Sequence, residues 1–347
     1  MMLNYKLIEI EDKDKWDSFI DSFDHVHGFQ LYEWGEVKRI QGWKPLRLAL
    51  IKDDKIIIAL QILSKSIMGF SIGQSPFGPV CDSQKVSKEE WKLFFRELNY
   101  YLKSKKIITL IFQPYFNLDL CQYSNLIRKV PFLLVYAKTY VINLEPDLED
   151  IFNSFNSKTR TQIRKSIRDG LITIEIDNSE RGFERFYKLY EETYFRTKAV
   201  PLRKEIFREM SKIFEKPKHL NIFFAKVSNI NASAIIVLSS GKTAVYQWAA
   251  SSSNPEIRKL NTQRRLVWEV VKYYKQNKYK IFDLGGIPDE EDIDRNSKHY
   301  GIYEFKSFFG EKVYENSGVY IISTFPTWFI SNAIRLQELF KMLRGWR

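Results

Sequence analysis

Short apolar runs bounded by turn residues alternate with longer amphipathic segments along this chain, which is the pattern of a mixed α/β protein. The apolar runs of the first third predict two strands around the polar turn Asp53-Asp54, then a helix and a further strand that stops at Gln113-Pro114. Ser87 is a suitable cap for that helix, because its hydroxyl can accept from the free N–H groups of the first turn. The expected elements are strands at 46–52 and 55–63, a helix over 87–104 and a strand at 107–112.

The second half of the chain repeats this arrangement. Strands are expected at 232–238 and 244–249, a helix at 262–276 and a strand at 280–284. Laying Tyr100-Tyr101 over Tyr273-Tyr274 superposes Ile108 on Ile281 and brings the two following strands into register. A two-copy repeat of this length predicts two similar α/β domains.

Further elements are expected between the two copies and at the end of the chain. They are a helix at 148–166, a strand at 171–176, helices at 180–195 and 203–214, and an amphipathic helix at 327–343. The domain boundary is expected near Leu144-Glu145-Pro146-Asp147, where a proline and acidic residues interrupt the apolar pattern.

The composition fits two folded domains and a polyanionic partner. The 347 residues are 44% hydrophobic, and Lys and Arg (54) exceed Asp and Glu (42), giving a net charge of +12. Cys81 and Cys121 lie far apart, and the four histidines form no ligand pattern, so we expect no metal and a reducing cytoplasm. No signal-like segment opens the sequence, and the apolar tract 318–330, broken by Pro326, is too short to span a bilayer.

One lysine, Lys306, is bracketed by aromatic residues and follows the strand end Asp283-Leu284-Gly285-Gly286. An ammonium held close to a buried strand end has a much larger effect on developing charge than one on an open surface. The segment around Lys306 resembles the corresponding segment of the Fem family of aminoacyl transferases. Further matches occur in family order: Gln30-Leu31-Tyr32-Glu33-Trp34 with Lys38, Phe77-Gly78-Pro79-Val80, 108–114, Ser157-Lys158-Thr159-Arg160 with Ile163-Arg164-Lys165, Tyr190-Glu191-Glu192-Thr193 with Arg196, and Tyr246.

This resemblance implies an architecture and an activity. It implies two tandem acetyltransferase-like (GNAT) domains in a compact, FemX-like form without a long helical arm, with residues 1–145 and 318–347 in the first domain and 146–317 in the second. The implied reaction transfers an amino acid from aminoacyl-tRNA to an amine of a peptidoglycan precursor. The acceptor is a UDP-linked or lipid-linked muramyl peptide, and we expect a cytoplasmic monomer with possible peripheral contact to the inner membrane face.

The resemblance also assigns roles to individual residues. Lys306 would stabilise the oxyanion of the tetrahedral intermediate, and Phe305 would help exclude water. Glu304, Asp283 or the substrate itself could take the proton of the acceptor amine. The implied acceptor-binding residues are Lys38, Trp34, Arg196, Tyr246, Gln113 and Tyr115. Gln113 departs from the family pattern, in which an acidic residue often precedes the matching proline.

A basic stripe is expected on the predicted helix after the boundary. Arginines at four-residue spacing share one face, and guanidinium groups pair well with phosphate, so we expect tRNA or nucleotide phosphate to bind there. The stripe consists of Lys158, Arg160, Arg164, Lys165 and Arg168. A solvated helix face is the alternative interpretation.

Two other functions are compatible with this sequence. One is an acyl-CoA-dependent N-acyltransferase, although the stretch Arg258-Lys259-Leu260-Asn261-Thr262-Gln263 lacks the glycine turn that usually holds the coenzyme A pyrophosphate. The other is a non-catalytic RNA-binding protein that uses the basic stripe. No cofactor is expected for the aminoacyl transfer, because the ester bond of the donor is already activated.

Overall fold

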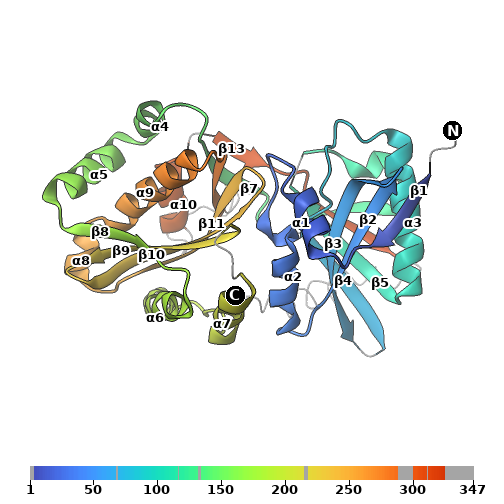
Figure 1. Cartoon of the computed structure of the whole chain (residues 1–347), viewed down its shortest axis with the longest axis horizontal. Coiled ribbons are helices and arrows are strands. Elements are labelled where there is room, and N and C mark those ends of the chain that lie inside the picture. Colours follow the sequence, from blue (N-terminus) through green and yellow to red (C-terminus); the bar gives the residue numbers. More distant parts are fainter. Residues whose placement is uncertain are drawn as a thin grey trace. The chain divides into compact units, whose positions relative to one another are not determined.

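The computed structural model describes residues 4–67, 69–115, 117–131, 134–214, 218–287, 300–310 and 312–324 (Figure 1). The chain divides into two compact units. Unit 1 comprises Met1–Val135 and Asn316–Arg347, and unit 2 comprises Tyr136–Glu315. Each unit contains one mixed seven-stranded sheet, which confirms the expected mixed α/β class.

The sheet of unit 1 has the strand order β1-β2-β3-β4-β5-β14-β6. Its pairs are antiparallel except for β4 and β5, which run parallel and are connected through α3. The strands are β1 (Tyr5–Glu9), β2 (Lys44–Lys52), β3 (Lys55–Ile67), β4 (Phe70–Phe77), β5 (Ile107–Pro114), β6 (Ile127–Val130) and β14 (Val319–Ser323). The helices are α1 (Lys13–Ile20), α2 (Tyr32–Arg39) and α3 (Lys88–Ser104), with short 3-10 helices η1 (Gly28–Gln30) and η2 (Leu120–Tyr123).

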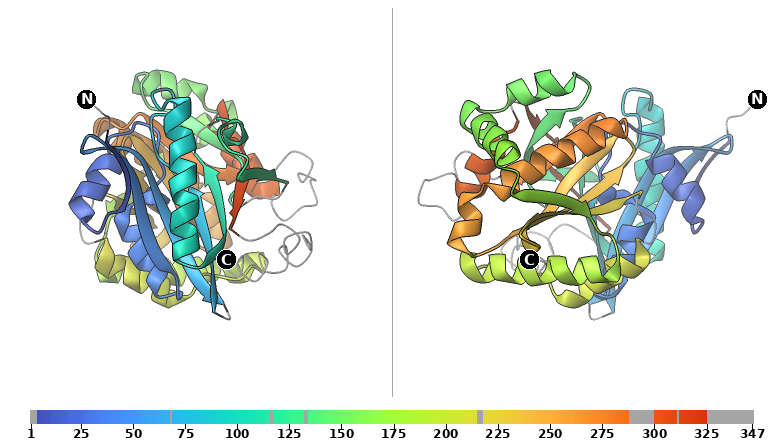
Figure 2. Two further views of the ribbon diagram at one scale, coloured as in Figure 1. Left: turned by 90° about the vertical axis from the view of Figure 1, so that its right-hand side faces the viewer. Right: turned by 60° about the vertical axis from the view of Figure 1, so that its left-hand side comes forward.

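Local sequence accounts for much of this unit. Asp53 and Asp54 both have positive φ, 47° and 67°, as the tight turn between β2 and β3 requires. Ser87 caps α3, as the sequence predicted, and it forms a capping box with Glu90. The apolar face of α3, with Trp91, Phe94, Phe95 and Leu98, packs into the core of this unit, and the helix lies along the sheet in the left view of Figure 2.

The sheet of unit 2 has the order β13-β7-β12-β11-β10-β9-β8. Its strands are β7 (Lys138–Asn143), β8 (Ile172–Ile176), β9 (Leu220–Val227), β10 (Ile230–Ser240), β11 (Thr243–Ser251), β12 (Ile281–Ile287) and β13 (Lys312–Glu315). Its helices are α4 (Leu148–Ser154), α5 (Ser157–Asp169), α6 (Glu180–Thr197), α7 (Lys204–Ile213), α8 (Pro255–Lys259), α9 (Thr262–Gln276) and α10 (Tyr300–Ser307).

Helices cover both faces of this second sheet. Buried residues of α9 such as Leu266 and Val270 share one apolar core with Phe223 and Ile235 of the sheet, and α5 packs on α9. On the other side, α6 packs against β10 and β11, as the right view of Figure 2 shows. The parallel pair β11 and β12, connected through α9, corresponds to β4 and β5 with α3 in unit 1.

The structure corrects three expectations. The helix expected over 148–166 is two helices, because Phe155 is extended and Asn156 caps the second one. Strand β4 was not expected. It follows β3 in the chain and pairs with it, so the strand pair directly before α3 is β3 with β4 and not the expected β2 with β3. The boundary lies between Val135 and Tyr136 and not near Glu145, because β7 pairs with β12 and β13 of the second sheet.

Two further expectations concern the end of the chain. Strand β14 pairs with β5 and β6, so the segment that follows unit 2 adds a strand to the first sheet. The helix expected at 327–343 lies outside the described residues. Across the described part of the chain, no helix combines the length and apolar character that crossing a bilayer requires.

Candidate active site

The end of β12 carries an irregularity that shapes the site. Its pairing with β7 shifts register between Asp283 and Gly286, which is a bulge of the kind common beside active sites. Gly285 has φ +77°, and a Cβ atom there would lie 3.0 Å from the Tyr246 carbonyl oxygen and 3.4 Å from the Lys306 Nζ. Both the backbone conformation and the space therefore favour glycine.

Lys306 lies in the last turn of α10 and reaches this bulge. Its side chain is buried, with 8% of the residue exposed, and Nζ donates a hydrogen bond of 2.9 Å to the Gly286 carbonyl oxygen. Burial lowers the pKa of Lys306 to about 8, and the negative charge of Asp283 opposes this shift. The group is therefore mostly an ammonium near neutral pH, and it is positioned in a weakly solvated place.

Asp283 and Thr139 hold the bulge in place through hydrogen bonds. The Asp283 carboxylate accepts a hydrogen bond of 2.7 Å from the Gly285 N–H and another from the Thr139 hydroxyl. Thr139 comes from β7, 144 residues earlier in the chain, and its hydroxyl also lies 2.8 Å from the Gly285 carbonyl oxygen. These contacts hold the backbone that presents the Gly286 carbonyl to Lys306.

Aromatic rings and a guanidinium surround the Lys306 segment. Phe305 packs against Phe309 at 5.2 Å, and the Arg264 guanidinium lies 5.6 Å from the ring centres of both Phe305 and Phe308. Burial lowers the pKa of Arg264, and the Glu304 carboxylate opposes this effect. Phe305 and Phe308 therefore lie beside a cation, and Phe305 also packs on a further ring.

Tyr246 on β11 contributes a neutral hydroxyl to the same region. Its oxygen accepts a hydrogen bond of 2.8 Å from the Gln263 side chain of α9. Burial raises the pKa of Tyr246 well above its ordinary value, so the phenol stays protonated at physiological pH. The predicted residues Lys306, Phe305 and Tyr246 therefore gather around one bulge, with Gln263 as a partner that was not expected.

In unit 1, Lys38 and Trp34 lie four residues apart and share a face of α2. Lys38 Nζ lies 4.4 Å from the centre of the Trp34 indole and donates a hydrogen bond of 3.0 Å to Gln41. Burial lowers the pKa of Lys38 well below its ordinary value. Gln30 ends η1, and α2 begins at Tyr32.

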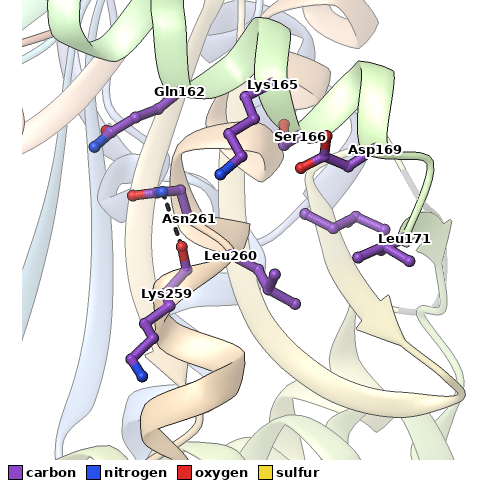
Figure 3. A pocket seen from close by; sticks show the side chains of 9 residues that line it. Gln162, Lys165, Ser166, Asp169, Leu171, Lys259, Leu260 and Asn261 are labelled. Carbon is purple, nitrogen blue, oxygen red and sulfur yellow. Dashed lines mark hydrogen bonds between the residues drawn. The ribbon is translucent and has the colours of Figure 1, made fainter.

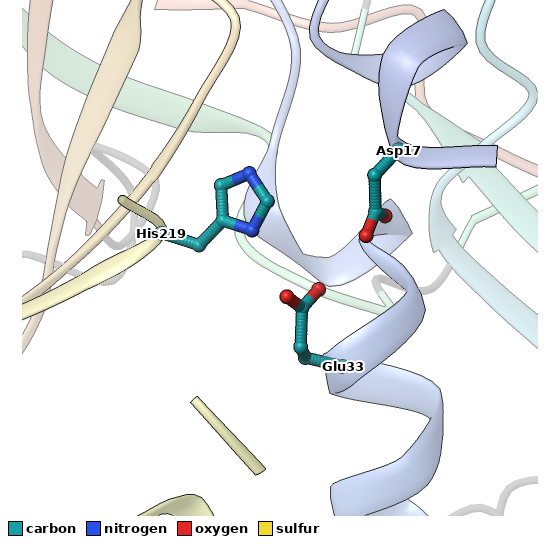
Figure 4. A group of neighbouring side chains, drawn as sticks. All are labelled: Asp17, Glu33 and His219. Atoms are coloured by element: carbon teal, nitrogen blue, oxygen red, sulfur yellow. The ribbon is translucent and has the colours of Figure 1, made fainter. Parts of the chain in front are cut away.

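The start of α2 is held by an acidic pair (Figure 4). Asp17 accepts from the Tyr32 N–H at 2.9 Å, and Lys13 bridges Asp17 and Glu33 at 2.6 and 2.7 Å. Burial and the neighbouring Glu33 charge raise the pKa of Asp17. This pair anchors the helix that carries Trp34 and Lys38.

A series of aromatic ring contacts links Trp34 to Tyr115. Phe29 stacks on Trp34 at 4.2 Å, Phe77 lies 5.8 Å from Phe29, and Tyr115 lies 5.1 Å from Phe77. The structure thus brings Trp34, Lys38 and Tyr115 together within unit 1. They form a rigid aromatic wall beside a buried lysine.

Gln113 has structural partners for its amide. It is fully buried, its oxygen accepts from the Leu134 and Val135 N–H groups at 3.1 and 2.9 Å, and its nitrogen donates to Asn316 at 3.1 Å. The chain leaves unit 1 after Val135 and returns at Asn316. Gln113 therefore forms hydrogen bonds to both segments at which the chain leaves and re-enters unit 1.

Comparisons with known proteins match this chain to acyl and aminoacyl transferases. A model of the FemAB family matches residues 12–129, and a model of an acetyltransferase (GNAT) domain matches residues 153–307. Lipid II:glycine glycyltransferase of Staphylococcus haemolyticus is 21% identical over 87% of this chain and 89% of that protein. The crystal structure of FemX covers 92% of this chain and 97% of its own, with a TM-score of 0.82 at 16% identity. The chain is a Fem-type protein with tandem GNAT domains.

A more distant likeness is to the structure of L-PGS from Bacillus licheniformis, with a TM-score of 0.57 at 11% identity and coverage of 97% of both chains. This likeness shows the fold alone. The two sheets of the Fem-type chain are thus its two GNAT domains, and the expected compact form is confirmed.

The basic stripe of the Fem-type chain lies on α5. Lys158, Arg164, Lys165 and Arg168 are exposed, while Thr159, Ile163 and Ser166 face the protein. Arg160 differs from them, because its guanidinium donates to the Asn153 and Phe155 carbonyl oxygens at 2.6 Å and so closes the end of α4. The start of α5 is tied to the Lys306 segment, since the Asn156 N–H donates to the Phe308 carbonyl oxygen at 2.9 Å.

A pocket lies between α5 and the connection from α8 to α9 (Figure 3). Lys165 and Lys259 line it together with Asn261, at the stretch where acyl-CoA enzymes hold a pyrophosphate. Asn261 has φ +57°, which is the left-handed conformation that glycine adopts most easily. Its side chain makes no capping hydrogen bond to α9.

Arg196 lies at the end of α6 in unit 2. Its guanidinium donates to the Ser251 hydroxyl at 3.0 Å, and burial and the neighbouring Arg258 lower its pKa. Lys38 belongs to unit 1 and Arg196 to unit 2.

Sequence reasoning missed Thr139, Gln263, Arg264 and Asn156. Gln263 ends the stretch whose lack of a glycine argues against coenzyme A, and Arg264 directly follows it. Thr139 has no local signal, because only the pairing of β7 with β12 brings it to Asp283.

Proposed function

We propose that this Fem-type chain is an aminoacyltransferase that moves an amino acid from aminoacyl-tRNA to an amine of a peptidoglycan precursor stem peptide. The observation that carries the proposal is the buried ammonium of Lys306, held by the Gly286 carbonyl beside Phe305. The names of the matched relatives, which include a lipid II:glycine glycyltransferase, support the same class of acceptor.

The reaction needs no enzyme nucleophile. The acceptor amine attacks the ester carbonyl carbon, a C–N bond forms, and the carbonyl oxygen becomes an oxyanion that the Lys306 ammonium stabilises. The C–O bond to the ribose then breaks, and the ribose oxygen leaves with the proton that the amine gives up. One oxyanion donor in a site of this kind contributes about 2.7–4 kcal/mol to the transition state.

The donor is proposed to bind along α5. This helix starts at the Lys306 segment through the contact of Asn156 with Phe308, and it carries four exposed cations. Phosphates lying along it would place the aminoacylated end of the tRNA toward Lys306. Arg160 would contribute indirectly, by holding α4 and α5 in place.

The acceptor is proposed to use Lys38 and Arg196 for its diphosphate and the Trp34, Tyr115 and Tyr246 rings for its sugar and peptide. A buried ammonium over an indole can bind phosphate oxygens while the ring excludes water. We favour a lipid-linked acceptor over a UDP-linked one, with a monomeric enzyme working at the inner face of the membrane.

An acyl-CoA-dependent N-acyltransferase is the second candidate. It is favoured by one observation, the left-handed Asn261 that opens α9 beside Lys165 and Lys259. Binding of acetyl-CoA would raise the melting temperature of the protein, so a thermal shift measurement separates the two functions.

The direct test is a product analysis. The purified protein is incubated with mixed aminoacyl-tRNAs and, in parallel, with lipid II or UDP-muramyl pentapeptide, and products are identified by mass spectrometry. A mass increase of one amino-acid residue on either acceptor is expected. No adduct with either acceptor would refute the proposed function.

A further inference from the structure

The Asp283 carboxylate is engaged by the protein itself, and this bears on how Lys306 works. One of its oxygens accepts from the Gly285 N–H and from the Thr139 hydroxyl. Asp283 is 2% exposed, so its oxygens do not face open solvent. A carboxylate held in this way stabilises the local backbone and places a negative charge near Lys306.

We propose that Asp283 is a positioning residue for Lys306, fastened by Thr139, and not the group that removes the proton of the acceptor amine. The inference rests on the proposed function. The Asp283 and Thr139 contacts fix the bulge whose next carbonyl, that of Gly286, accepts from Nζ at 2.9 Å. The ammonium is thereby aimed before the substrates bind, which is how preorganised sites lower a barrier.

The charge of Asp283 has a second effect on Lys306. Burial disfavours the ammonium, and the Asp283 carboxylate is the negative group that opposes this. The ionisable groups that face the bulge from β13 and β11 are Tyr314 and Tyr246. Burial and the Asp283 charge raise the pKa of Tyr314 to about 12, and burial raises that of Tyr246, so both are neutral at pH 7. Glu304, on α10 itself, is exposed, and Arg264 of α9 lies over the Phe305 and Phe308 rings.

A role as general base would require a different geometry. A base must present a free oxygen to the proton that it removes. The Asp283 Oδ1 atom already accepts from two donors, and the Thr139 hydroxyl bridges it to the Gly285 carbonyl. In the proposed mechanism, the departing ribose oxygen or another group of the substrates takes the proton of the amine.

The first experiment measures the protonation of Lys306 directly. The Nζ signal is followed by NMR against pH in lysine-labelled protein and assigned with Lys306→Arg. In Asp283→Asn the side-chain amide still offers an oxygen to the Gly285 N–H but carries no negative charge. The midpoint of the Lys306 titration is therefore expected to fall by about one pH unit or more. Asp177→Asn, in the same unit and away from the bulge, is the matched control and should leave the midpoint unchanged. An unchanged midpoint in Asp283→Asn would overturn the proposal.

The second experiment uses the hydroxyl. Thr139→Val is expected to lower kcat by about tenfold or more with the KM values of both substrates unchanged, because only the aim of the ammonium is altered. Thr139→Ser keeps the hydroxyl and should retain wild-type kcat. Equal kcat in the Val and Ser variants would remove Thr139 from this role, and a purely structural role would lower the melting temperature without lowering kcat.

The two readouts separate this inference from the proposed function. If Asp283 acts through the charge of Lys306, Asp283→Asn should lose more activity at pH 8 than at pH 6, because Lys306 is protonated at pH 6 in both proteins. A loss of about a hundredfold at every pH with an unchanged Lys306 midpoint would identify Asp283 as the base and overturn the inference. Absence of aminoacyl transfer by the wild type would refute the proposed function, while the NMR midpoints would still decide the link between Asp283 and Lys306.

Discussion

The ammonium of Lys306 donates to the Gly286 carbonyl oxygen at 2.9 Å, and this contact fixes a buried cation at the end of β12. Lys306→Met is expected to lower kcat by about a hundredfold, because an oxyanion donor acts only in the transition state. Methionine keeps the apolar stem, so folding should be preserved. Steady-state kinetics and a melting curve check both points, and wild-type turnover in this variant would refute the oxyanion role.

The protonation of Lys306 predicts a pH profile. Burial lowers its pKa to about 8, so the active ammonium form dominates below pH 8 and is lost as the pH rises above it. We expect kcat to fall about tenfold for each pH unit above 9. Lys306→Arg should have lower activity but no such decline, because the guanidinium stays charged. An alkaline decline of the same midpoint in the Arg variant would assign the titration to another group.

The exposed cations of α5 predict salt-dependent tRNA binding. Charge reversal of Arg164 and Lys165 together should weaken binding and reduce the slope of log K against log salt by about 0.7–0.9 for each lost phosphate contact. Lys88→Glu with Lys103→Glu, two exposed positions of α3, changes the net charge equally and is the control. Equal effects of the two double variants would mean that net charge, and not α5, governs binding.

Lys38 and Arg196 are expected to act on acceptor affinity. Lys38→Met and Arg196→Ala should each raise the KM for the acceptor more than they lower kcat, since a remote diphosphate is held in ground and transition state alike. Lys65→Met is the matched control, because Lys65 also lies over an indole of unit 1, that of Trp43 at 5.4 Å. The hypothesis fails if the acceptor KM is unchanged in both test variants.

The buried amide of Gln113 predicts a loss of stability. Gln113→Ala leaves the N–H groups of Leu134 and Val135 without this acceptor, which should cost about 1–3 kcal/mol of the free energy of unfolding. Gln122→Ala, at an exposed amide that also bonds to backbone, should cost much less. Denaturant unfolding measures both, and a Gln113 variant as stable as the Gln122 variant would contradict the structural role.

Local sequence was sufficient for elements whose signals lie within a few residues. The turn at Asp53-Asp54, the cap at Ser87 and the whole of α9 follow from local side chains and appear as predicted. The division of the expected helix at Asn156 was also readable in principle, because asparagine followed by Ser157 is a good cap. The amphipathic pattern continues on both sides of Asn156, however, and this continuity predicts one uninterrupted helix.

Pairing between distant strands was not readable in the same way. Strand β7 enters the second sheet between β12 and β13, and β14 enters the first between β5 and β6. Both are short apolar strands that would fit either sheet. The alternation of apolar and polar residues indicates which face of a strand is buried, but it does not identify the strand that pairs with it. The expected boundary therefore fell after β7 and not before it.

The sequence by itself determined α3 and α9 with strands beside them, the repeat, and the family-like segment around Lys306, because these depend on residues close together in the chain. Only the tertiary structure decided which groups act on that lysine. Thr139 meets Asp283 across 144 residues, and Arg160 closes α4 although its spacing suggested a phosphate contact. Hydrogen bonds of this kind depend on the register of two strands or the angle between two helices, and neither leaves a mark in the local pattern of apolar and polar residues.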